Sequence, residues 1–374
     1  MASKARTTQL YRRAIALAES TKLSSSTTTR QLYHQSRTSS PAQIISRQQK
    51  ICSKHLTSAS TPQLKSFSTS TPLSFAKKSS TLPMMAKEDE FILTLSCSDR
   101  PGIVHAVTGF LAQHNQNIVD SQQFGDPTSK KFFMRVHFAP ADIAAGNKMS
   151  VEELKSSFEQ TAQSMAMDYE LTSLGKKPRV MIMVSKIGHC LNDLLFRQSI
   201  SQLGIDVPLI VSNHPDFEPL AASYKIPFHH LPVTAATKVE QETRILELVK
   251  ENNIDLIVLA RYMQVLSPTL CTAMSGKIIN IHHSFLPSFK GAKPYHQAYD
   301  RGVKIIGATA HFVTSDLDEG PIIEQNVVRV GHALSPKELT LEGSNVESNV
   351  LATAVKWVTE RRVLLNGHKT VVFN

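Results

Sequence analysis

Two segments in the second half of the sequence carry side chains whose types and spacing suit chemistry at a carbonyl group. Asn280 and His282 lie two residues apart in "NIHHSFLPSFKG" (280–291), so an extended chain would point both side chains to one side. Asp318 lies in "HFVTSDLDEGPII" (311–323), in a turn after a further apolar run. An amide, an imidazole and a carboxylate that converge would stabilise a transition state with negative charge on a carbonyl oxygen.

The same part of the sequence leaves a metal site open as an alternative. Zinc and iron are commonly held by imidazole and carboxylate groups. Adjacent imidazoles on a strand point to opposite faces, however, and the sequence contains no H-x-x-x-H or H-E-x-x-H helix. We therefore expect neither a metal nor another cofactor. The side chains that would supply a metal shell are His282, His283, His296, His311 and Asp318.

The segment from 178 to 374 alternates apolar runs with helical stretches such as 238–253. The runs are nearly continuous, which is typical of strands buried on both faces. This pattern predicts an α/β fold with an open, mostly parallel, doubly wound sheet, whose ligands bind at the carboxyl ends of the strands. The predicted strands are "RVMIMVS" (179–185), "VPLIVSN" (207–213), "IDLIVLA" (254–260) and "KIINIH" (277–282).

A smaller folded segment, 88–174, precedes this sheet. Its strand-like and helix-like runs follow in the order βαββαβ, which is the ferredoxin-like arrangement. Ser150 and Glu153 form a capping box at the start of its second helix, and Ser335 with Glu338 forms another before a long final helix.

The first strand–helix turn of the small segment, "SDRPGIV" (98–104), resembles the opening of ACT domains, regulatory modules that often bind amino acids. Asp99 would cap the helix, Pro101 suits its first turn, and Gly102 would let a ligand approach the exposed amides. The resemblance implies an amino-acid effector site and a homo-oligomer. A structural turn in a dimerisation module is the alternative. The effector-site residues would be Asp99, Arg100, Pro101 and Gly102.

The two chemistry-bearing segments resemble the signatures of the formyltransferase family that uses 10-formyltetrahydrofolate. The likeness extends over roughly 180–374. It implies that Asn280 holds the formyl oxygen, and that protonated His282 stabilises the oxyanion that develops there. Asp318 would orient or deprotonate the attacking group and favour the charged imidazole.

With an ACT-like segment in front, the chain looks like the deformylase branch of that family, in which water accepts the formyl group and formate and tetrahydrofolate are released. "HHSFLP" (282–287) and "RRVLLNGHKTVVF" (361–373) resemble this branch, whereas transferases usually have proline at the position of His283. The turn "SKIGHCLNDLL" (185–195) also lacks the G-x-G of a phosphate cradle. Formyl transfer to an amine and a non-catalytic, amino-acid-sensing folate binder are the alternatives.

The resemblance further implies a folate site against 259–266 and the loop at 314–318. Two positions depart from the family pattern: Gln264 stands where arginine is common, and "GSN" (343–345) replaces Gly-Arg-Asp. Neither departure touches the three residues expected to be catalytic. The implied substrate-binding residues are Tyr262, Met263, Gln264, Leu266, His283, Thr314, Asp316 and Leu317.

The net charge of +10 is confined to one end of the chain. Residues 1–87 contain 14 lysines and arginines and one acidic residue, whereas the remainder has a net charge of −3. A basic, Ser/Thr-rich leader is typical of a mitochondrial transit peptide, so we expect a matrix protein, with a cytosolic form if translation starts at Met84 or Met85. The near-neutral remainder argues against a nucleic-acid partner, and no apolar run is long enough to span a membrane.

Overall fold

A computed structural model of the 374-residue chain describes residues 89–141, 149–288 and 294–374. The predicted leader, 1–87, lies outside these residues. Within the described ranges, no helix combines the length and the apolar character that crossing a membrane requires.

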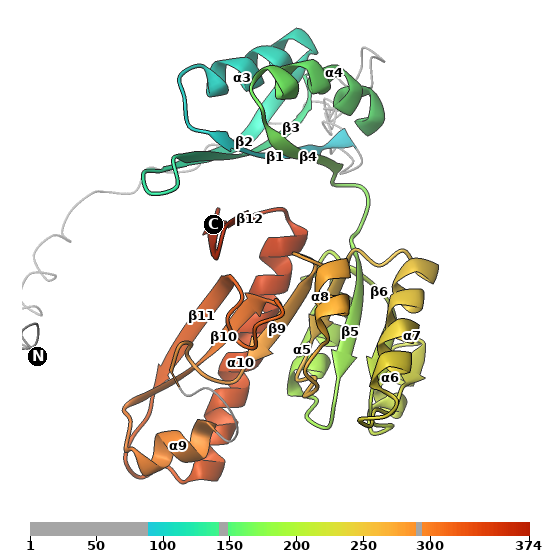
Figure 1. Cartoon of the computed structure of the whole chain (residues 1–374), viewed down its shortest axis with the longest axis vertical. Coiled ribbons are helices and arrows are strands. Elements are labelled where there is room, and N and C mark those ends of the chain that lie inside the picture. Colours follow the sequence, from blue (N-terminus) through green and yellow to red (C-terminus); the bar gives the residue numbers. More distant parts are fainter. Residues whose placement is uncertain (1–88, 142–148, 289–293) are drawn as a thin grey trace, which may run out of the picture. The chain divides into compact units, whose positions relative to one another are not determined.

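Residues 91–173 form a four-stranded antiparallel sheet with both helices on one of its faces (Figure 1). The strand order β2-β3-β1-β4 and the element order βαββαβ confirm the predicted ferredoxin-like fold. The elements are β1 (Phe91–Ser98), α3 (Ile103–Gln113), β2 (Gln116–Asp126), β3 (Lys131–Pro140), α4 (Val151–Ser164) and β4 (Asp168–Ser173).

The two helices of this sheet begin differently. Helix α4 begins with the predicted capping box, in which the Ser150 hydroxyl accepts from the Glu153 amide and the Glu153 carboxylate accepts from the Ser150 amide. The prediction that Asp99 caps α3 is wrong. The cap position is Gly102, whose φ of 95° turns the chain into the helix without a side-chain cap. This left-handed conformation suits glycine because it carries no Cβ.

The second sheet has seven strands in the order β11-β10-β9-β8-β5-β6-β7. The strands from β9 to β7 are parallel, and β10 and β11 extend the sheet in antiparallel fashion, which confirms an open, mostly parallel α/β sheet. A hairpin of β12 (Val363–Asn366) and β13 (Lys369–Val372) follows. The strands are β5 (Arg179–Val184), β6 (Asp206–Ser212), β7 (Phe228–His230), β8 (Leu256–Leu259), β9 (Ile278–His282), β10 (Ile305–Phe312) and β11 (Ile322–Arg329).

Helices cover both faces of this sheet, which explains why its strands are apolar throughout. Val180 and Ile182 of β5 pack in the same buried cluster as side chains of α5 and α10. Met181 and Met183 point the other way and pack with side chains of α7 and α8. The helices are α5 (His189–Ser199), α6 (Glu218–Ser223), α7 (Lys238–Glu251), α8 (Pro268–Ala273), α9 (Pro294–Asp300) and α10 (Pro336–Thr359).

Helix α10 begins where the sequence predicts. The Ser335 hydroxyl accepts from the Glu338 amide, the Glu338 carboxylate accepts from the Ser335 amide, and Pro336 occupies the first turn. The buried side of this 24-residue helix contacts β9, β10 and β11. The helix therefore covers the strands that carry the candidate site.

Candidate active site

Asn280 and His282 occupy the carboxyl end of β9, next to the point where the sheet changes from parallel to antiparallel pairing. Both side chains point to the same side, as the spacing predicts. His282 is buried, with 5% of its surface exposed. Strand β10 runs antiparallel beside β9, and its register places His311 directly opposite Asn280.

Asp318 lies in the loop that joins β10 to β11, and its φ of 57° is left-handed. Gly320 fixes this loop, because a Cβ at that position would overlap the carbonyl oxygen of Phe312. The Phe312 amide donates to the Pro321 carbonyl over 2.9 Å, which closes the turn. Gly320, where only glycine fits, therefore allows the loop conformation that places the Asp318 carboxylate beside His282 of β9.

The imidazole of His282 and the carboxylate of Asp318 are in direct contact. Nδ1 of His282 is 3.2 Å from Oδ1 of Asp318. The hydrogen bond from His282 lowers the pKa of Asp318, so this group is a carboxylate at neutral pH. On the other side of the ring, His282 Nε2 is buried and has no hydrogen-bond partner among the described residues. That nitrogen is therefore the one available to a substrate.

His311 orients the amide of Asn280. Nδ1 of His311 donates to the Phe312 carbonyl over 2.9 Å, and Nε2 lies 3.2 Å from Nδ2 of Asn280. Burial lowers the pKa of His311, so its neutral ring accepts a hydrogen bond from the Asn280 amide. Sequence reasoning considered His311 only as a metal ligand, because the register that sets it opposite Asn280 is not visible in the sequence.

A cavity of about 560 Å³ opens over these side chains and is lined by every residue predicted to bind substrate. Tyr262 and Leu266 are largely buried in the core, so their part in the lining is small. The side chains of Met263 and Leu317 are more than half exposed at its rim. The predicted residues that line it are Asn280, His282, Asp318, Tyr262, Met263, Gln264, Leu266, His283, Thr314, Asp316 and Leu317.

His283 lines the same cavity as His282, so the expectation that adjacent imidazoles point to opposite faces is wrong here. Strand β9 ends at His282, and strand alternation does not continue beyond it. The centroids of the two rings are 5.2 Å apart. Burial, followed by the nearby Arg261, lowers the pKa of His283 to about 3, so its ring is uncharged at neutral pH.

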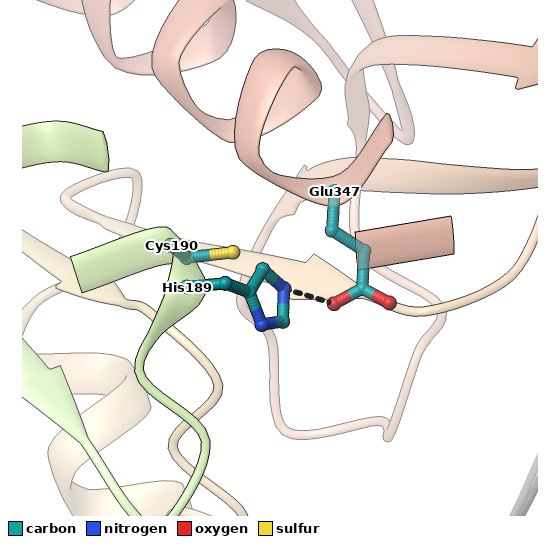
Figure 2. Close-up of side chains that lie close together, drawn as sticks. All are labelled: His189, Cys190 and Glu347. Carbon is teal, nitrogen blue, oxygen red and sulfur yellow. Dashed lines mark hydrogen bonds and ion pairs between the residues drawn. The ribbon is translucent and has the colours of Figure 1, made fainter. Parts of the chain in front are cut away.

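A buried polar cluster that sequence reasoning missed lies near His283, whose ring centroid is 6.2 Å from that of Tyr295. Glu347 of α10 is 1% exposed and accepts hydrogen bonds on both carboxylate oxygens. His189 Nε2 donates to Oε2 over 2.8 Å (Figure 2), and the Tyr295 hydroxyl donates to Oε1 over 2.5 Å. Arg261 Nε lies 3.4 Å from Oε2. A glutamate within a helix is usually solvent-facing, so the sequence carries no signal for this cluster.

The described residues contain one group whose donor atoms converge as metal ligands do, and it differs from the set considered in the sequence. His189, Cys190 and Glu347 place one ligand atom each within 4.8 Å of one another (Figure 2). Burial raises the pKa of the Cys190 thiol, which disfavours the thiolate that metals bind. The Arg261 guanidinium beside Glu347 also opposes a second cation at this place.

The residues predicted to form an effector site lie elsewhere. Asp99, Arg100, Pro101 and Gly102 are exposed in the turn before α3, and none of them lines the cavity. Arg100 donates to the carbonyl of Ser164 over 3.0 Å, which ties this turn to the end of α4.

Comparison with known proteins assigns both folded segments. Residues 178–355 match the formyl transferase family, and residues 91–147 match the ACT domain. The formyltetrahydrofolate deformylase of Corynebacterium sp. (strain P-1) is 50% identical over 288 residues, which cover 77% of this chain and 99% of that protein. The deformylase of Bacillus subtilis is 44% identical and is covered to 95%.

Solved structures lead to the same family. The crystal structure of formyltetrahydrofolate deformylase from Burkholderia mallei has a TM-score of 0.73 and 51% identity, over 76% of this chain and all of that chain. A glycinamide ribonucleotide transformylase from Symbiobacterium toebii is more distant, with a TM-score of 0.51 and 28% identity over 53% of this chain and 95% of that chain. The chain therefore belongs to the formyltetrahydrofolate deformylase family.

Proposed function

We propose that this protein hydrolyses 10-formyltetrahydrofolate to formate and tetrahydrofolate. The observation that carries this proposal is the arrangement of Asn280, His282 and Asp318 at the cavity, with His282 Nε2 buried and free to donate. The family membership supports it, because the chain spans almost the whole length of relatives named for this activity.

Each of the three residues has a role in this reaction. Water attacks the formyl carbon, and negative charge develops on the formyl oxygen. Asn280 and the protonated His282 donate hydrogen bonds to this oxyanion. Asp318 contacts His282 through Oδ1, which leaves Oδ2 to receive the water and its proton. The bond between the formyl carbon and N10 then breaks, N10 takes up the proton that Asp318 received, and formate leaves as its remaining hydroxyl proton passes to solvent.

The reaction as proposed needs no metal ion and no other cofactor. The hydrogen-bond donors of Asn280 and His282 supply the stabilisation that a Lewis acid would otherwise give. The glycine in the first turn of the second sheet also has a packing role rather than a phosphate-binding one. A Cβ at Gly188 would overlap the ring of Phe217, so close packing alone accounts for this glycine.

Formate release from 10-formyltetrahydrofolate, measured with the full chain and without an amine, tests this proposal. We expect release that persists in EDTA and falls about 10²–10³-fold in His282→Ala and Asp318→Asn, because each change removes transition-state stabilisation. His368→Ala, an exposed change in the C-terminal hairpin, is the matched control. Release only after an amine is added would instead indicate a transferase. Loss of activity in EDTA would indicate a metal, and folate binding without turnover a binding protein.

We also propose that the ACT domain binds an amino acid at Asp99, Arg100, Pro101 and Gly102. The exposed turn and the open backbone at Gly102 support this assignment. Glycine and methionine are the first candidates, since both are linked to one-carbon chemistry. Calorimetric titration of each amino acid into the wild type and Gly102→Val is the test. Equal binding to both proteins would place the effector elsewhere.

We further propose a homo-oligomer that forms through the ACT domain. Strand β2 is the edge of its sheet and exposes Val119 and Phe124 at 55% and 45%. An edge strand with exposed apolar side chains is a ready surface for pairing with a second copy. Light scattering of the wild type and Val119→Lys checks this, and a monomer in the wild type would contradict it.

The proposed location is the mitochondrial matrix, with a cytosolic form from an internal start. The concentration of positive charge in residues 1–87 supports this proposal. A fluorescent fusion of the full chain should enter mitochondria, and one that begins at Met85 should remain in the cytosol. Cytosolic fluorescence of the full-chain fusion would contradict the proposal.

A further inference from the structure

Arg261 places a buried positive charge in the wall of the cavity that also contains the residues of the proposed reaction. Its side chain is 7% exposed, and it lines the cavity together with His283. Its Nε and Nη1 are buried without hydrogen-bond partners among the described residues. Buried donors are nearly always satisfied in folded proteins, so two unsatisfied ones on a cation facing a cavity point to a ligand.

The backbone holds Arg261 in an unusual conformation. Its φ is 64°, which is left-handed and unfavourable for a long side chain. The Ser185 amide donates to the Arg261 carbonyl over 3.2 Å, and the Ser185 hydroxyl accepts from the amide of Met263 over 3.0 Å. These two bonds hold the backbone on either side of the residue, so they fix the position from which its side chain enters the cavity wall.

Glu347 balances the charge of Arg261 but does not satisfy its donors. The carboxylate already accepts from His189 on Oε2 and from Tyr295 on Oε1 (Figure 2). Oε2 of Glu347 lies 3.4 Å from Nε of Arg261, so the two groups form an ion pair but not a hydrogen bond. The result is a braced cation whose Nη1 has no hydrogen-bond partner among the described residues and is available to a ligand.

A small carboxylate suits this cation, because carboxylate oxygens accept charge-assisted hydrogen bonds from guanidinium N–H groups. We propose that Arg261, braced by Glu347, forms a subsite for a small carboxylate, and that formate produced in the same cavity occupies it. The identity of the occupant rests on the proposed function. The substrate carries a neutral formyl group, and hydrolysis converts it to an anion within the same cavity. The subsite thus distinguishes product from substrate by charge.

The test measures binding of ¹³C-formate to the folate-free full chain by NMR, so it needs no turnover. Arg261→Gly removes the guanidinium and suits the left-handed backbone. We expect it to weaken formate binding at least about tenfold, the loss of one charge-assisted contact. Glu347→Gln keeps the shape but removes the opposing charge, and we expect it to tighten formate binding roughly three- to tenfold. Arg244→Gln, on the exposed side of α7, should leave binding unchanged.

Opposite effects of the two variants would separate a ligand-binding role from a structural one. Weaker binding in both variants, or unchanged binding in Arg261→Gly, would overturn the subsite. If Arg261→Gly does not fold, tighter binding in Glu347→Gln alone supports the proposal, and weaker or equal binding overturns it. Formate binding in this pattern with no hydrolysis would leave the subsite standing and remove the proposed function. Hydrolysis without formate binding would remove the subsite and leave the proposed function standing.

Discussion

At the scale of single residues, two adjacent histidines have different electrostatic surroundings. His282 lies against the Asp318 carboxylate, whereas His283 is half-buried near Arg261. Burial, followed by the guanidinium, lowers the pKa of His283, whereas His282 is placed to donate a hydrogen bond to Asp318. One imidazole is thus suited to donate to an oxyanion, and the next remains a neutral part of the cavity wall.

His283 should make the protein less stable in mild acid. Its pKa falls from 6.5 in the unfolded chain to about 3 in the folded protein. Below pH 6.5 the unfolded state therefore binds a proton that the folded state does not, and stability falls with decreasing pH. Between pH 6.5 and about 5 the loss is up to about 2 kcal/mol from this group.

Urea unfolding at several pH values checks this prediction. His283→Gln should show a smaller loss of unfolding free energy over this interval than the wild type. His296→Gln, which changes an exposed ring, should follow the wild type. Parallel curves for wild type and His283→Gln would show that the ring is protonated in the folded protein.

Residue types and spacing predicted much of the site, but not its supporting contacts. Asn280 and His282 could be identified because a strand end and a two-residue spacing are local properties, and the resemblance to a family supplied Asp318. His311 and Glu347 could not be identified. The first depends on antiparallel register between β9 and β10, and the second on which side of α10 is buried.

At the scale of elements, helix α10 and the short helix α9 fit together through one glycine. A Cβ on Gly343 of α10 would overlap the ring of Tyr295 in α9. Tyr295 reaches Glu347, one turn further along α10, only because this position is bare. The segment "GSN" (343–345) departs from the family pattern in its second and third residues, but it keeps Gly343, which this packing requires.

Gly343→Ala should displace Tyr295 and break its hydrogen bond to Glu347. We expect a loss of about 1–3 kcal/mol in unfolding free energy, because the overlap outweighs the better helix propensity of alanine. Denaturant unfolding measures this loss. Glu342→Ala changes the exposed neighbour on the same helix and should have little effect. A Gly343→Ala protein as stable as the wild type would mean that Tyr295 moves aside without lowering the free energy of unfolding.

The start of α3 shows why some local predictions fail. The sequence offered Asp99 as a cap, but the helix begins only after Gly102. A capping residue must directly precede the first turn of its helix. Helix α3 begins at Ile103, and three residues separate Asp99 from it. The boundary was set by the left-handed glycine rather than by the nearest acidic side chain.

At the scale of the whole molecule, the positive charge and the proposed chemistry lie in different parts of the chain. The cavity is lined by residues between 187 and 347, whereas the excess positive charge lies in residues 1–87. We expect a chain that begins at Met85 to hydrolyse 10-formyltetrahydrofolate at the full-chain rate. Steady-state assays of both chains check this, with cation-exchange retention to confirm the lost charge. A large loss of kcat in the shorter chain would assign the leader a part in catalysis.

The hydrogen bond between His189 and Glu347 joins positions 158 residues apart in sequence. Closing so long a loop lowers the conformational entropy of the chain before stabilising contacts form. Contacts between residues this far apart in sequence are therefore expected to form late in folding. During refolding from urea, formate release should therefore return more slowly than the far-ultraviolet circular dichroism of the helices. A nascent chain on the ribosome would likewise lack this buried carboxylate until nearly all of the protein has been synthesised.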